Sequence, residues 1–202
     1  MDPILVPADR ALPLLEPERA ERSDAAHNRE VLLRAAVELV EERGVCAVTM
    51  DDVARRAGVG KGTLFRRFGS REGLMGQLLD HSEREWQAAV IGGPPPLGPG
   101  APPLERLLAF GASRMVLNLR HAELIEAARH PGARSLAALS FPTMHVRYLL
   151  GELGVEGDLP YLATALVAPL EIIVLRQQVE RENVPLARIQ AGWEDLVHRV
   201  IR

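Results

Sequence analysis

Several residue types are scarce in this sequence. Its 202 residues include one cysteine, Cys46, and one lysine, Lys61, and aromatic side chains make up 4% of the chain. A single cysteine excludes an internal disulfide framework and favours a reducing compartment. We expect Cys46 to be a small packing residue, since no neighbouring motif marks it as a reactive thiol.

Signals for strands, export and membrane insertion are also missing. No β-type alternation occurs, and the N-terminus lacks the basic start and the long apolar run of a signal peptide, so we expect a cytoplasmic protein. The most apolar stretch, 160–179, carries Glu171, Arg176 and Pro169, which we expect to kink a helix there. We therefore predict one helix buried on both sides, and no membrane partner.

The sequence shows no pattern of catalysis or metal binding. There is no GxSxG elbow, no Cys–His pair at a recognisable spacing and no pair of carboxylates on an evident cleft. His121, Glu123, Glu126, His130 and His145 could gather around a metal, but no HxxxH or CxxC spacing enforces a site. We expect no enzyme activity, no catalytic residue, no metal and no cofactor.

Two short amphipathic helical patterns lie between Thr49 and Phe68. In the first, Asp51 to Ala57, Thr49 is a suitable N-cap, and Gly58 can adopt the left-handed conformation that ends a helix. In the second, Leu64, Phe65 and Phe68 form an apolar stripe opposite Gly62, Thr63, Arg66 and Arg67. Two such helices joined by a glycine-bearing turn are typical of a helix-turn-helix.

Basic residues concentrate in this part of the chain. The whole sequence has a formal net charge of −3, but the stretch from Arg43 to Arg71 contains seven basic residues and two acidic ones, a net charge of +5. A local basic patch on an acidic protein favours DNA at that surface.

The same residues resemble the Tet-repressor (TetR) family of transcriptional regulators. The similar part runs from about Asn28 to Leu79 and includes TMDDVA, AGVGKGTLFRRF and the serine-initiated SREGL. The resemblance implies that Thr49 and Arg71 hold phosphates, that Lys61, Thr63 and Arg66 face base edges, and that Arg67 lies near the DNA backbone. Phe65 stands where the family commonly has a phosphate-binding tyrosine, and Gly60 replaces a common serine cap. The candidate DNA-binding residues are Thr49, Lys61, Gly62, Thr63, Phe65, Arg66, Arg67 and Arg71.

Composition and periodicity divide the chain into three parts. Residues 1–26 have many prolines and acidic groups, so we predict a disordered arm there and no helix before Ser23 or Asp24. Residues 27–72 would form the helix-turn-helix domain. Residues 73–202 would form a helical domain, entered through a long helix capped by Ser70 and interrupted by a flexible Pro/Gly loop at about 91–103. The predicted fold is all-α.

The second domain is expected to bind a small molecule and to dimerise. Its interior would be walled by apolar side chains with a few polar ones: Phe110, Arg114, Met115, His121, Phe141, Met144, His145, Tyr148, Leu166, Leu170 and Glu171. Surplus apolar surface on the last two helices indicates a homodimer. The predicted interface residues are Leu175, Val179, Ile189, Trp193, Leu196 and Val200.

These patterns predict a DNA-binding regulator that reads a pseudo-palindromic operator as a homodimer. By resemblance it would be a repressor, released by a small, largely apolar effector. Two alternatives stay open: a helical adaptor on the same fold that binds a protein partner, and an enzyme built on that fold.

Overall fold

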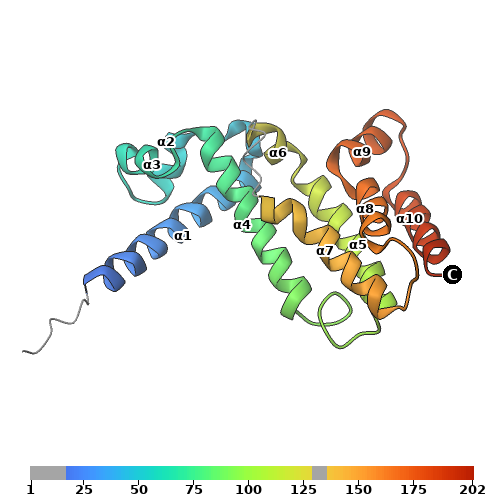
Figure 1. The fold of residues 1–202 in the computed structure, drawn as a ribbon. Helices are drawn as coiled ribbons and strands as arrows, with labels where there is room; N and C mark the ends of the chain where they lie inside the picture. The colour runs from blue at the N-terminus through green and yellow to red at the C-terminus, as the bar shows by residue number, and fades with distance from the viewer. Residues whose placement is uncertain (1–16, 129–135) are drawn as a thin grey trace, which may run out of the picture.

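The computed structural model describes residues 17–128 and 136–202, and within these ranges the regular structure is entirely helical (Figure 1). Three helices and one 3₁₀ turn come first: α1 (Pro17–Arg43), η1 (Val45–Ala47), α2 (Met50–Arg56) and α3 (Lys61–Phe68). The long α4 (Arg71–Gly92) leads from them into the rest of the molecule. The all-α fold predicted from the sequence is confirmed.

The second half of the chain is a bundle beside the lower part of α4. It consists of α5 (Pro103–Arg120), α6 (Ala122–Ala128), α7 (Leu136–Glu152), α8 (Leu159–Val167), η2 (Ala168–Leu170), α9 (Ile172–Arg176), the π turn η3 (Gln177–Arg181) and α10 (Leu186–Val200). The Pro/Gly loop between α4 and α5 begins at Gly93, because α4 continues through Ile91 and Gly92.

The N-terminal helix begins earlier than the sequence pattern predicts. It starts at Pro17, so residues 17–26, which were predicted to be disordered, are helical. Proline is well suited to the first turn of a helix, because the backbone N–H that it lacks would have no partner there. The rest of the predicted arm, 1–16, lies outside the described residues.

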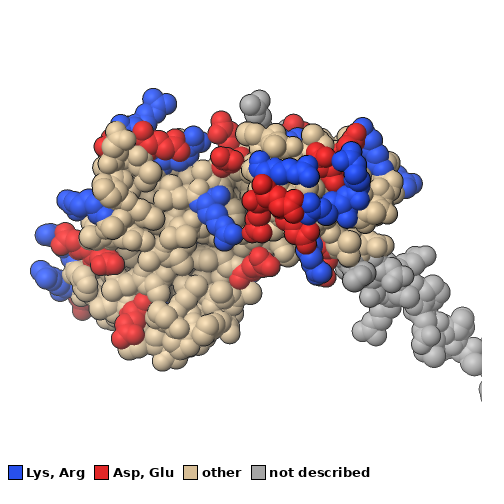
Figure 2. Space-filling model, turned by 180° about the vertical axis from the view of Figure 1, so that it is seen from behind, with Lys and Arg blue, Asp and Glu red and all other residues tan. Residues whose placement is uncertain are grey.

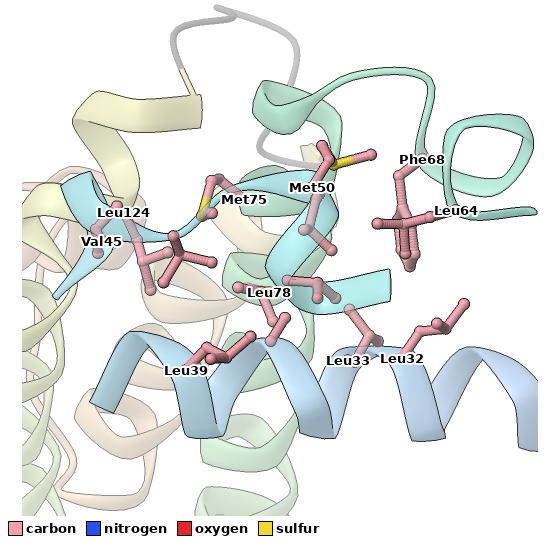
Figure 3. Packing of buried hydrophobic residues seen from close by; sticks show 14 of the residues in the cluster. Leu32, Leu33, Leu39, Val45, Met50, Leu64, Phe68, Met75, Leu78 and Leu124 are labelled. Carbon is pink, nitrogen blue, oxygen red and sulfur yellow. The ribbon is translucent and has the colours of Figure 1, made fainter. Parts of the chain in front are cut away.

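Two hydrophobic cores lie along α4. The first joins α1, α2, α3 and the start of α4 through side chains such as Leu39, Val53, Leu64 and Leu78. Figure 3 shows its side chains lined up along α1, with Leu39 near Leu78, and Leu64 and Phe68 above Leu32. Leu124 and Ala128 of α6 also belong to it. The second core begins at Trp86 on the same helix. The sequence assigns α6 to the second domain, but its buried side chains pack against the first.

The apolar stretch 160–179 is broken rather than continuous. Pro169 provides no backbone N–H, and the chain leaves the α conformation from Ala168 to Glu171. The segments Leu159–Leu170 and Ile172–Arg181 meet at 41°. Among the described residues no single helix is long and apolar enough to span a membrane, and only this bent pair meets the length and composition criteria together.

Candidate nucleic-acid interface

The turn between α2 and α3 is built from local backbone signals. The Thr49 side chain accepts a hydrogen bond from the Asp52 N–H, and the Asp52 side chain accepts one from the Thr49 N–H, which forms a capping box. Gly58 has φ +69°, the left-handed conformation predicted for the end of α2. The Val59 N–H then donates to the Ala54 carbonyl at 3.0 Å, and Val59 packs against the first core.

One side of α3 fixes the helix and the other faces solvent. Leu64 is fully buried and Phe68 is 7% exposed, so both anchor α3 in the first core. Phe65, which the stripe pattern groups with them, is 40% exposed and lies outside this core. The remaining side is exposed and consists of Lys61, Gly62, Thr63, Arg66 and Arg67.

Ion pairs within the chain reduce the charge of this surface. Lys61 Nζ lies 2.7 Å from an Asp51 carboxylate oxygen and 5.8 Å from the centre of the Phe65 ring. Arg56 bonds to Glu42 of α1 at 2.6 Å, and this bond is the main cause that lowers the pKa of Glu42. Figure 2 shows basic and acidic groups side by side over α1 to α3. The net charge of +5 therefore overstates the free positive charge, because acidic groups of α1 were not counted.

Thr49 and Arg71 have structural partners in this conformation. The Thr49 hydroxyl lies 2.5 Å from an Asp52 oxygen, and hydrogen bonding from Thr49 lowers the pKa of Asp52. Arg71 Nε donates to the Val48 carbonyl at 2.9 Å, and its Nη2 donates to the Val45 carbonyl at 2.5 Å. Arg71 thus ties the start of α4 to the segment that precedes α2, a role that the sequence pattern does not indicate.

Five of the eleven predicted ligand-binding residues are apolar members of the second core. Phe110, Met115, Leu166 and Leu170 are fully buried, and Phe141 is 8% exposed. Figure 1 shows α5, α7 and α8 side by side, and these helices supply that core.

Two polar residues of the predicted pocket are also buried there. Arg114 Nη1 lies 2.8 Å from both Glu83 oxygens, and its guanidinium carbon lies 4.7 Å from the Trp86 ring centre. His145 Nε2 has no hydrogen-bond partner, and burial, followed by the Arg106 charge, lowers the pKa of His145 to about 4.

Four residues predicted for the interior lie elsewhere. Met144 and Tyr148 are 55% and 52% exposed, because α7 turns its 145, 146, 149 and 150 side into the core. His121 lies at the end of α5, where its Nε2 is 3.2 Å from the Ser82 hydroxyl. Glu171 is the extended residue that precedes α9. These positions do not form one cavity.

His121 instead lines a pocket of about 390 Å³ between α1, α4 and α6. Its rim carries Glu41, Glu85, Glu123 and Arg120, and Arg120 bonds to Glu41 at 3.2 Å. Among the described residues no group of three or more His, Cys, Asp or Glu side chains could hold a metal ion, and His130 lies outside that part of the chain. Cys46 is exposed on η1 and not packed as expected.

Three predicted dimer residues are already buried within the single chain. Leu175 is fully buried, Ile189 is 8% exposed and Trp193 is 4% exposed, with Trp193 Nε1 donating to the Leu166 carbonyl at 2.8 Å. Their side chains pack within the chain, where α5 contacts both α9 and α10 and α10 also contacts α8. Val179, Leu196 and Val200 are half-buried at the edge of the second core.

Sequence reasoning missed two buried polar residues. In the sequence, Glu83 is one of several charged residues of α4, but in the structure it pairs with Arg114, 31 positions away. Asn118 Nδ2 donates to the Leu170 carbonyl at 2.7 Å. The burial of Arg114 could be predicted from the sequence, because it lies on the same side of its helix as the apolar Phe110. No local pattern identifies the partners, because they come from distant helices.

Comparison with known proteins identifies the N-terminal module. Residues 32–78 match the model of bacterial regulatory proteins of the tetR family. An HTH-type transcriptional repressor of Mycobacterium tuberculosis is 44% identical over 50 residues, which are 25% of this chain and 27% of that protein. The matches to the first curated relatives thus span about a quarter of their length. The HTH-type regulator BetI of Rhizobium meliloti is 27% identical over 192 residues, covering 86% of this chain and 89% of the relative.

The fold similarity extends to the whole molecule. FadR of Thermus thermophilus, a TetR-family repressor solved with lauroyl-CoA, aligns with a TM-score of 0.56 at 22% identity, covering 84% of this chain and 92% of that one. The overall arrangement of helices in this chain is thus similar to that of a solved TetR-family protein. The chain is a member of the tetR family of bacterial regulatory proteins.

Proposed function

We propose that this protein is a ligand-responsive transcriptional repressor that binds a pseudo-palindromic operator in the cytoplasm as a homodimer. The exposed side of α3 carries the proposal: Leu64 and Phe68 hold the helix from behind, while Lys61, Thr63 and Arg66 extend into solvent. An exposed helix of this kind fits the DNA major groove, where arginine and lysine recognise guanine edges.

Phosphate contacts would come from the same end of the molecule. The N-terminus of α3 has no side-chain cap at Gly60, and Phe65 and Arg67 are exposed beside it. Gly62 bears no side chain, and a Cβ there would meet nothing within 4 Å, so the DNA backbone could approach closely. Thr49 and Arg71 would contribute only by giving up part of their present hydrogen bonding.

Dimerisation would use the exposed surfaces of the bent segment and of α10. Tyr161 and Ile173, at 72% and 78% exposed, are the two most exposed large hydrophobic side chains of the described residues. A twofold contact over these elements would place two copies of α3 on one duplex. Half-buried Val179, Leu196 and Val200 would border that contact.

The dimer proposal is tested by light scattering. Ile173→Asp would introduce a charge into the contact and shift wild-type dimers to monomers, whereas Ile91→Asp, at a 62% exposed isoleucine of α4, would leave the mass unchanged. A wild-type monomer at micromolar concentration would refute the dimer.

The effector that we infer is a small, largely apolar molecule. FadR of Thermus thermophilus was solved with lauroyl-CoA, and a mainly apolar effector fits the largely apolar second core of this chain. The adaptor and enzyme alternatives have less support, since the described residues include exposed basic groups on α3 and no arrangement that suggests catalysis.

Selection of binding sites from a random DNA library separates these functions. The wild-type protein should recover a pseudo-palindrome, and Arg66→Ala should relax base preference at a cost of about 1–3 kcal/mol. Arg147→Ala, an exposed arginine of α7, serves as the control and should change nothing. Folded protein that recovers no preferred sequence would exclude the regulator and favour an adaptor.

A further inference from the structure

A second pocket lies at the far end of the bundle, between α5, the bend after α8 and α10. Its volume is about 470 Å³, within the range of small-molecule sites in proteins. Its walls are largely apolar, with Met115 from α5, Pro169 from the bend, and Ile189, Trp193 and Leu196 from α10. We call it the α5–α10 pocket.

Two irregularities of the bent segment border this pocket. Pro169 lies in the 3₁₀ turn that ends α8, and Gln178 lies in the π turn that follows α9. A continuous helix over 160–179 would place different side chains here. Because π turns cost stability and are frequent at functional sites, their position beside a pocket indicates a use for it.

Gln178 provides the specific chemistry. Its backbone carbonyl accepts a hydrogen bond from the Val184 N–H at 2.9 Å, but its side-chain Oε1 is buried and has no hydrogen-bond partner. An unpaired buried acceptor destabilises a protein. Gln178 lines the pocket, and a rotation of its side chain would bring Oε1, which is closed to solvent in this conformation, to a ligand that donates to it. Arg188 also lines the pocket, and its Nη1 lies 3.7 Å from where a Cβ on Gly192 would be.

We propose that the α5–α10 pocket binds a small apolar molecule bearing an N–H or O–H group, which donates to Gln178 Oε1 once that side chain turns toward the pocket. Arg188 at the pocket wall would accept an acidic group on the same molecule. The pocket touches both the bent segment and α10, so occupancy would alter the elements assigned above to the dimer. This last step rests on the proposed function, whereas binding itself does not.

The probe for this site is 8-anilinonaphthalene-1-sulfonate, which combines apolar rings, one N–H donor and a sulfonate, and which fluoresces in apolar surroundings. Gln178→Met keeps the side-chain length and removes the unpaired acceptor. We expect its melting temperature to rise and its affinity for the probe to fall about tenfold, as for one lost hydrogen bond in a buried site.

Gln177→Met is the matched control. Gln177 lies next to Gln178 in the π turn, but it is exposed and does not line this pocket. Its replacement should change neither the melting temperature nor the affinity for the probe appreciably. Equal probe affinity in wild type and Gln178→Met, or a lower melting temperature of that variant, would overturn the proposal.

Operator binding is measured separately, with the DNA recovered by selection. If the probe binds through Gln178 but leaves operator affinity unchanged, the site stands and its role as an effector site fails. If no operator is recovered, the regulator function fails, while the fluorescence result still decides the site.

Discussion

At the scale of single residues, the groups that the family resemblance assigns to DNA already have partners within the chain. Lys61 pairs with Asp51, and Arg71 holds the carbonyls of Val45 and Val48. The Lys61 pair is exposed, so Lys61 can leave Asp51 to contact DNA. Arg71 is half-buried and joins two elements, so its contacts stabilise the fold. A substitution can therefore distinguish binding from folding at each position.

Arg71→Ala is predicted to destabilise the helix-turn-helix. The change leaves two carbonyls without their donor, and the free energy of unfolding should fall by about 1–3 kcal/mol. Urea unfolding followed by circular dichroism measures this loss, with Arg147→Ala as an exposed control. If Arg71→Ala unfolds like the wild type and loses only DNA affinity, Arg71 is a phosphate ligand and not a structural residue.

Asp51→Asn is predicted to strengthen operator binding several-fold. The change frees Lys61 from its 2.7 Å ion pair and removes a negative charge that faces the DNA. Asp195→Asn makes the same chemical change at an exposed pair on α10, where Asp195 lies 2.8 Å from Arg199, and should leave affinity unaltered. Fluorescence anisotropy over a salt series provides the comparison, and equal affinities for Asp51→Asn and wild type would place Lys61 outside the DNA contact.

At the scale of elements, local sequence signals predict where helices begin and end. The arrangement of helices depends on contacts between distant segments, which local signals do not reveal. The caps at Thr49 and Ser70 and the left-handed Gly58 are encoded within a few residues, and all three occur as expected. The kink expected at Pro169 occurs, but the break into separate helical segments was not predicted, because the apolar pattern continues across it. The exposed position of Tyr148 was missed because an apolar helix such as α7 does not indicate which side meets its neighbours.

Gly111→Ala is predicted to disturb the contact between α5 and α10. A Cβ at this position would lie 2.2 Å from a ring atom of Trp193, so the indole must shift and the protein should lose about 1–3 kcal/mol. Gly151→Ala, in α7 with nothing within 4 Å, should instead add about 0.5–1 kcal/mol through helix propensity. Thermal unfolding of the two variants should therefore shift in opposite directions, and a Gly111→Ala protein as stable as wild type would refute the close packing.

At the scale of the whole molecule, stability should decline in mildly acidic solution. The pKa of His145 is lowered to about 4 by burial and then by Arg106, whereas the ordinary value for the unfolded chain is 6.5. Between these pH values the unfolded state binds a proton at this histidine and the folded state does not. The contribution of His145 to the free energy of unfolding is therefore fully present above pH 6.5 and is lost as the pH falls toward 4. Burial lowers the pKa of His121 in the same direction.

The urea midpoint should accordingly fall between pH 7 and 5, and His145→Phe, which keeps a ring beside Phe141, should reduce that fall. A variant with the wild-type dependence on pH would show that His145 does not titrate with unfolding.

The central claim is that two chains read one operator through paired α3 helices. It is tested most directly by measuring affinity for the selected operator while the half-site spacing is varied. Because the two helices would be held about one DNA turn apart, roughly 34–36 Å, adding about half a turn should abolish tight binding, and a whole extra turn should restore little of it. Equal affinity at all spacings, or one chain per duplex at saturation, would contradict the account.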